Sequence, residues 1–233
     1  MANPGVDSLD GKSLFLEGLQ PVQIETILAA AKPLHFCEQS VITRQGSQAN
    51  QFFLLAKGRA RYFLNTPDGR KVLLMWISPG EVFGGAAFSG RPWHYMISTE
   101  AVRDCTVYAW DRPAIRNLAR RFPQLFENAL LIASEYFLWY VDTHVTLISR
   151  SAPQRLAHVL FHLSHSLGRR VDGGVELEVT NEDLASTANI TPFTASRLLG
   201  RWQKSGLVRK HRGRVLVHSP DQLLDHALAV SSV

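Results

Sequence analysis

Apolar and polar positions follow three different patterns along the chain. Residues 21–31 have the spacing of a short helix, with Pro21 suited to its first turn. From about 34 to 112, short apolar runs rich in β-branched, aromatic and leucine residues are separated by glycine-containing turns roughly ten residues apart. This second pattern predicts the strands of a β-sandwich or β-roll.

The third pattern follows Pro123, after which no proline or glycine occurs until Pro153. Side chains recur there every seven residues in two series that together form one seam: Leu125, Ile132, Trp139 and Thr146, and Ala129, Tyr136 and Thr143. We therefore predict a long helix over 123–150 that pairs with a second copy of itself. Packing of this seam on the helix's own domain is the alternative. A second helix to about residue 167 and a loop at 168–174 complete this region.

Two helices are expected within 180–206, with Thr180 and Thr191 as their N-caps and a short turn between them. The following segment, 207–220, reads as a two-stranded wing with Gly213 at its tip. Two short helices, a tight turn and a β-wing together predict a winged helix-turn-helix.

Composition is that of a folded protein with room for two domains, since 45% of the 233 residues are hydrophobic and 19% are charged. No apolar run is long enough to cross a bilayer, and the first residues lack the pattern of a signal peptide, so a cytoplasmic protein is expected. The only cysteines, Cys37 and Cys105, are too few for a disulfide scaffold and lack the spacing of a zinc motif.

Basic residues are concentrated near the C-terminus. The net charge is +5, and residues from 150 onward hold 11 Lys and Arg against 7 Asp and Glu, a net +4. Seven of these cations fall within 197–214, where there is no acidic residue: Arg197, Arg201, Lys204, Arg209, Lys210, Arg212 and Arg214. A basic cluster in a small domain favours a polyanionic partner.

The order of β-roll, long helix and winged helix-turn-helix resembles the bacterial family of the cyclic-AMP receptor protein and the fumarate–nitrate reduction regulator, the Crp/Fnr family. The resemblance is strongest in ITPFTASRLLGRWQKSGLV, residues 190–208, and extends to PGEVFGGAAFSGRP, residues 79–92. It implies an α+β chain with three parts: an N-terminal double-stranded β-roll (cyclic-nucleotide-binding-like) at 14–122, a long dimerisation helix at 123–150 and a C-terminal winged helix-turn-helix at 151–227. It also implies a homodimer that binds an inverted repeat of double-stranded DNA and contacts RNA polymerase.

In the resembled family, early exposed positions of the second helix read base edges in the major groove. Here those positions hold Phe193, Ser196 and Arg197, and Arg197 is expected to contact a guanine. Phe193 stands where relatives often hold a Glu that binds cytosine. A phenyl ring accepts no hydrogen bond but can pack on a thymine methyl, so this cytosine preference should be lost. A buried Phe193, and an Arg197 bound to a phosphate or a carboxylate, are the alternatives. Phosphate contacts are expected from Thr191, Thr194, Arg201, Lys204, Lys210, Arg212 and Arg214.

The expected effector pocket comprises Phe83, Gly84, Gly85, Ala86, Arg91, Pro92 and Trp93, with Trp139 and Tyr140 from the long helix. Cyclic-AMP-binding members carry a Glu where Gly85 stands and a Ser or Thr where Pro92 stands. Loss of these anchors argues against cyclic AMP. Two cysteines argue against an iron–sulfur cluster, which usually needs four thiolates. The effector is therefore left unassigned.

Haem is an open alternative that would make the chain a sensor of nitric oxide or carbon monoxide. Its axial ligands could come from His35, His94, Met96, Cys105 and His144. A cyclic-nucleotide-binding-like regulatory module that acts on a protein partner is the alternative from another class. The sequence contains no P-loop, nucleophile elbow, zinc-protease or kinase motif, so an enzyme is not expected.

Overall fold

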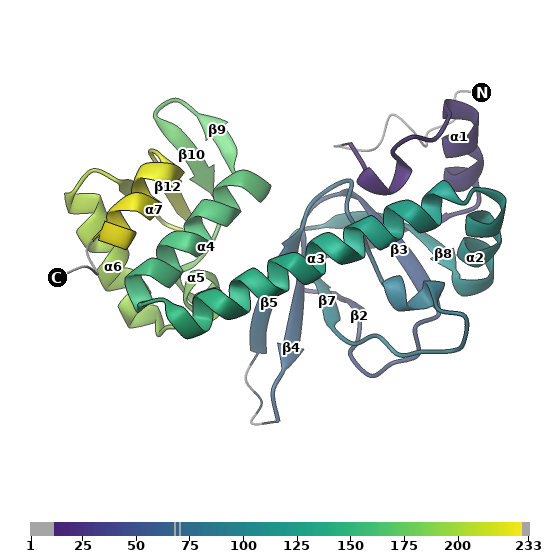
Figure 1. Ribbon diagram of the computed structural model, residues 1–233, viewed down its shortest axis with the longest axis horizontal. Coiled ribbons are helices and arrows are strands. Elements are labelled where there is room, and N and C mark those ends of the chain that lie inside the picture. The colour runs from purple at the N-terminus through teal and green to yellow at the C-terminus, as the bar shows by residue number, and fades with distance from the viewer. Residues whose placement is uncertain (1–11, 68, 70, 230–233) are drawn as a thin grey trace. The chain divides into compact units, whose positions relative to one another are not determined.

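The computed structural model describes residues 12–229 apart from 68 and 70, and divides into two compact units between Leu138 and Trp139, inside a long helix (Figure 1). The N-terminal unit contains, in chain order, η1 (Leu14–Leu16), α1 (Pro21–Ala29), β1 (Lys32–Phe36), β2 (Val41–Thr43), β3 (Gln51–Lys57), β4 (Ala60–Asn65), β5 (Lys71–Ile77), β6 (Val82–Phe83), η2 (Gly85–Phe88), β7 (Ser98–Ala101), β8 (Cys105–Asp111) and α2 (Arg112–Arg121). Helix α3 (Gln124–Ser149) follows.

The strands form two antiparallel four-stranded sheets, with orders β1-β8-β3-β6 and β2-β7-β4-β5, and confirm the predicted β-roll. Strand β3 is apolar on both faces because each face packs on a different layer. Phe53 and Leu55 join a core that draws on both sheets. Phe52 and Leu54 point the other way and pack with residues of α1, α2 and α3.

Helix α3 agrees with the expected bounds, but its seam is different from the one predicted. Leu125 and Ile132 are 0% and 9% exposed and belong to the core of their own unit, with Ala129 and Tyr136 packed against it. Leu125 and Ile132 are therefore not available to a second copy, which corrects the predicted seam at these two positions, whereas Ala129 and Tyr136 keep part of their surface exposed. Of the other predicted positions, Trp139 and Thr143 are partly buried and Thr146 is buried.

A different face of α3 is exposed and apolar. Five of its large side chains recur at spacings of four and seven residues, and we call them the α3 stripe: Phe126, Leu130, Phe137, Val141 and Ile148. Leu131, Leu138, Tyr140 and Val145 are exposed beside it. The stripe lies about one residue, or roughly 100°, around the helix from the predicted seam.

The C-terminal unit contains, after α3, α4 (Ala152–Ser166), β9 (Arg169–Val171), β10 (Gly174–Leu177), α5 (Asn181–Thr187), α6 (Pro192–Lys204), β11 (Val208–His211), β12 (Arg214–Val217) and α7 (Pro220–Ala229). The wing is broader than predicted, since β11 and β12 belong to a four-stranded antiparallel sheet of order β11-β12-β10-β9. The predicted loop at 168–174 is wrong, because β9 and the start of β10 lie in it. Within the described residues, no helix is long and apolar enough to cross a membrane.

Glu81, in the turn between β5 and β6, gives the N-terminal unit a pH-dependent stability. Burial raises the pKa of Glu81 above its ordinary value near 4.5, although the Ser78 amide donates a hydrogen bond of 2.6 Å to it. The folded chain therefore holds this proton to a higher pH than the unfolded chain does. We expect the free energy of unfolding to fall as pH rises from about 4.5 through the raised pKa.

Glu81→Gln keeps an oxygen acceptor for the Ser78 amide but cannot ionise, so it should flatten this part of the stability profile. Urea unfolding of both proteins across the mildly acidic range measures the effect. Equal slopes in the variant and the unsubstituted protein would contradict it.

Candidate nucleic-acid interface

The helix-turn-helix is built by local capping. Thr180 caps α5, where its hydroxyl accepts from the Asp183 amide at 3.1 Å. The turn that follows is closed by a 2.9 Å hydrogen bond from the Ile190 amide to the Ala185 carbonyl. It passes through Asn189 at φ 48°, a left-handed conformation that asparagine tolerates better than most residues. Thr191 then caps α6, and its hydroxyl accepts from the Thr194 amide at 3.1 Å.

Helix α6 has one buried face and one exposed face. Its buried side chains are Ala195, Leu198, Leu199 and Trp202. The exposed positions recur every three or four residues along the opposite face and comprise Phe193, Arg197, Arg201 and Lys204. Phe193 is 78% exposed, which excludes the alternative of a buried core aromatic. A large apolar ring in water at the start of a basic helix face is a feature that a DNA major groove could cover.

The two threonine hydroxyls and Ser196 are less free than predicted. Thr191 and Thr194 hydrogen-bond to each other through their hydroxyls at 2.9 Å, so these groups already serve the cap. Ser196 is partly buried, and its hydroxyl accepts from the Lys210 ammonium of β11 at 3.4 Å. This contact joins the helix face to the wing.

Most of the predicted basic residues keep an uncompensated charge. Among residues 12–229 without 68 and 70, none of the following forms an ion pair: Arg197, Arg201, Lys204, Arg209, Lys210 and Arg212. The alternative of an intradomain salt bridge for Arg197 therefore has no support in this part of the chain. Arg214 differs, because its guanidinium lies 3.6 Å from Glu176 and 3.3 Å from Glu178. We leave Arg214 out of the phosphate-contacting set for that reason.

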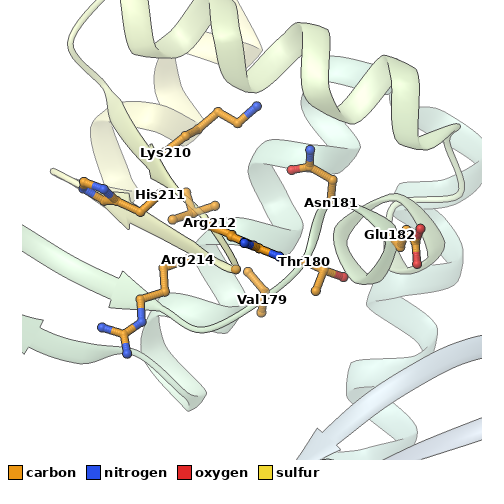
Figure 2. Close-up of a pocket in the computed structure, with 10 residues that line it drawn as sticks. Val179, Thr180, Asn181, Glu182, Lys210, His211, Arg212 and Arg214 are labelled. Carbon is orange, nitrogen blue, oxygen red and sulfur yellow. The ribbon is translucent and has the colours of Figure 1, made fainter.

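A hollow of about 410 Å³ lies between the start of α5 and the wing, and Figure 2 shows the residues that line it. In this view the Arg212 side chain extends toward Thr180 and Asn181, whereas that of Arg214 points away. Lys210 extends toward the helix above it. The hollow thus has a cationic wall contributed by the wing and a polar wall contributed by the start of α5.

Arg155 on α4 is a positioning residue that the sequence reasoning missed. Its guanidinium donates to the carbonyls of Ala188 and Asn189 at 2.9 and 3.1 Å, and to the carbonyl of Arg150 at 3.0 Å. It thereby ties the turn of the helix-turn-helix to the junction of α3 and α4. No motif marks this role, because a partly buried arginine that binds carbonyls looks the same in sequence as any helical arginine.

The expected effector segment lies partly in the core of the N-terminal unit. Phe83 is a core side chain, stacked on Phe53 with ring centroids 4.9 Å apart. Gly84 has φ 79°, and a Cβ there would lie 2.8 Å from the Gln51 carbonyl, so this glycine is required by the backbone. Gly85 is exposed and Ala86 is partly buried in η2.

The rest of the expected pocket lies in an exposed loop or beyond the N-terminal unit. Arg91, Pro92 and Trp93 are exposed, and the Arg91 guanidinium lies 5.6 Å from the Trp93 ring centroid. Trp139 and Tyr140 belong to the C-terminal unit.

The candidate haem ligands differ in burial. Cys105 is buried in the sheet core, where its thiol donates to the carbonyls of Arg59 and Arg103. His35 is exposed and bonded to Thr106 at 3.1 Å, so it lies on the opposite face of the β1–β8 pair from Cys105. The other three candidates, His94, Met96 and His144, are exposed.

Comparison with known proteins gives the class of this fold. Residues 33–122 match the cyclic nucleotide-binding domain, and residues 154–226 match the Crp-like helix-turn-helix domain. Neither is the profile of an enzyme family. The chain belongs to the Crp/Fnr family of transcription regulators, and α5, α6 and the wing form its helix-turn-helix DNA-binding domain.

Relatives align along almost the whole chain. The cyclic AMP receptor protein of Thermus thermophilus is 28% identical over 225 residues, which is 96% of this chain and 100% of the relative. The fumarate and nitrate reduction regulatory protein of Salmonella typhimurium is 22% identical, and the alignment covers 86% of this chain and 80% of the relative. In fold, the chain is similar to a CooA mutant from Carboxydothermus hydrogenoformans, with a TM-score of 0.75 at 19% identity over 94% and 96% of the two chains.

Arg155→Lys tests the role of the guanidinium, because an ammonium cannot reach three carbonyls at once. We expect it to lower the free energy of unfolding by about 1–3 kcal/mol, the range for losing hydrogen bonds to a charged group. DNA affinity should fall as well, since the turn that carries α6 loses its anchor. Urea unfolding and fluorescence anisotropy measure the two effects, with Arg150→Lys as the control. An unchanged free energy of unfolding in Arg155→Lys would show that the three hydrogen bonds do not stabilise the fold.

Proposed function

We propose that this chain is a homodimeric, sequence-specific transcription regulator that binds an inverted-repeat operator through α6 and the wing. The observation that carries this proposal is the exposed face of α6, where Phe193 precedes the unpaired cations Arg197, Arg201 and Lys204. Cations without a carboxylate partner are available to the phosphates of a duplex, and their neutralisation releases counterions. RNA polymerase is the further partner expected of such a regulator.

The bases are read at the start of α6. Arg197 supplies the two parallel donors that match the O6 and N7 acceptors of guanine. Phe193 packs on a thymine methyl and accepts nothing from cytosine. Ser196 is held beside Lys210 and adds a hydroxyl at the edge of this surface. Arg201, Lys204, Lys210 and Arg212 contact phosphates and fix the register without reading sequence.

Dimerisation uses the α3 stripe. Its five side chains expose a continuous apolar line at helical spacing, and an apolar line of this kind is stabilised by pairing with another. A two-fold pair of chains presents two copies of α6, which matches the symmetry of an inverted repeat.

The effector is one other than cyclic AMP, or there is none. Gly85 offers no carboxylate to a ribose, and Pro92 offers neither a hydroxyl nor an amide to a phosphate. A nucleotide in this segment would leave its polar groups poorly paired. If an effector binds, it acts by favouring one arrangement of the long helices and the DNA-binding domains over another.

Selection from a random duplex pool tests the DNA-reading proposal. We expect an inverted repeat with a guanine in each half-site and no cytosine preference at the position that Phe193 faces. Adding cyclic AMP should leave this outcome unchanged. Phe193→Glu should restore the cytosine preference, because a carboxylate accepts from the cytosine amino group.

Substitution of two cations distinguishes base recognition from phosphate contact in the same assay. Arg197→Ala should cost about 1–3 kcal/mol and relax the guanine preference, whereas Lys204→Ala should weaken all sequences alike and lower the salt dependence. Recovery of the family's cytosine-containing half-site by the unsubstituted protein would overturn the role given to Phe193.

Two neighbouring leucines test the dimer. Leu130 lies in the α3 stripe, and Leu131, also exposed, lies about 100° away around the helix. Leu130→Glu should weaken the dimer by at least about tenfold, because it places a charge in an apolar seam. Leu131→Glu should weaken the dimer less, because Leu131 lies outside the stripe. Sedimentation equilibrium of the two variants measures this, and equal dissociation constants would show that the stripe is not the interface.

A further inference from the structure

A group of three metal-ligating side chains lies in the C-terminal unit. Asp142 is on the last part of α3, and His158 and His162 are one turn apart on α4. Residues four apart on a helix share a face, so both imidazoles point toward the same neighbour. The Asp142 Oδ2 atom lies 3.3 Å from His158 Nε2 and 3.5 Å from His162 Nε2.

We propose that Asp142, His158 and His162 form a binding site for a zinc ion that links the end of α3 to α4. Two imidazoles and a carboxylate form a common ligand set for zinc, with a fourth position left to water or another ligand.

The distances fit this metal closely. Two ligand atoms at about 2.0–2.1 Å from a tetrahedral zinc lie about 3.3–3.4 Å apart. The two oxygen–nitrogen separations, 3.3 and 3.5 Å, are close to this value. All three ligand atoms lie within 4.8 Å of one another. The rings of His158 and His162 are crossed at 68° with centroids 4.5 Å apart.

The exposure of the three groups is compatible with an ion arriving from solvent. The side chain of Asp142 is 53% exposed, and those of His158 and His162 are 21% and 41% exposed. A metal held here would restrict the junction that contains Ser149, Arg150 and Ser151. The proposal stands whether or not the chain binds DNA as proposed above, since it rests only on the three ligands.

Cobalt is the probe, because tetrahedral Co²⁺ absorbs visible light and zinc does not. The full-length chain, without a polyhistidine tag and freed of metal by a chelator, is titrated with Co²⁺ and then with Zn²⁺. We expect the visible bands of tetrahedral Co²⁺ to saturate at one equivalent per chain and to disappear on addition of Zn²⁺. Zinc should also raise the midpoint of thermal unfolding by mass action.

Asp142→Asn and His162→Gln should each weaken Co²⁺ and Zn²⁺ binding by at least about tenfold, the loss seen even for outer partners of a metal ligand. His165→Gln is the matched control. His165 is on the same helix, but its ring bonds to the Phe161 carbonyl at 2.9 Å and is outside the group. Asp142 is exposed, so its variant should unfold near the same temperature as the unsubstituted protein without metal.

Two results would overturn the proposal. One is the absence of tetrahedral Co²⁺ bands, which would leave the three groups as a carboxylate hydrogen-bonded to two imidazoles. The other is equal metal affinity in Asp142→Asn, His165→Gln and the unsubstituted protein, which would place any bound metal elsewhere.

Discussion

The guanidinium of Arg155 holds the backbone on which the DNA-binding unit depends. A helix-turn-helix works only if the second helix leaves the turn at a fixed angle, and the turn amides of Asn189 and Ile190 already donate to the carbonyls of Ser186 and Ala185. Here the carbonyls of Ala188 and Asn189 are satisfied by a planar, permanently charged donor on α4. The same donor reaches Arg150 at the end of α3. One side chain thus joins the turn that precedes α6 to the helix junction.

Charge in this unit is divided between structure and recognition. Glu176 and Glu178 on β10 and its continuation compensate Arg214, and Glu176 also pairs with Arg169 at 2.6 Å. These pairs stay within the sheet. The cations of α6 and of the wing tip have no such partners in the part of the chain that the structure describes. The exposed cations of α6 therefore concentrate positive charge on the helix face that starts with Phe193.

The sequence predicted the β-roll, the long helix, the two short helices and the wing because each has a strong local signal. Periodicity also identified an apolar seam on α3, but not which of two apolar faces it was. One face packs on the helix's own unit through Leu125 and Ile132, and the other is exposed at Leu130 and Phe137. Only tertiary contacts separate the two, since both have helical spacing.

Residues of the candidate DNA-binding site could be identified from the sequence only where their residue type indicates the role. Arg197 and Lys204 were found because basic residues cluster on one helix. The exposed position of Phe193 was predicted from the family resemblance and not from residue type, because an aromatic residue usually lies in the core. Arg155 and the Asp142–His158–His162 group act across helices and depend on distances that no sequence pattern encodes. The β9–β10 hairpin was missed because Gly168, Gly173 and Gly174 look like loop residues.

Strand β3 has a consequence for how the N-terminal unit opens. Its side chains alternate between two cores, so Phe53 and Leu55 cannot lose their partners without also disturbing Phe52 and Leu54. A fluctuation that separates the sheets therefore also loosens the layer that holds α1, α2 and the first half of α3. The two cores should therefore unfold as one cooperative unit. The amide hydrogens of β3 should exchange with solvent only when the whole N-terminal unit unfolds.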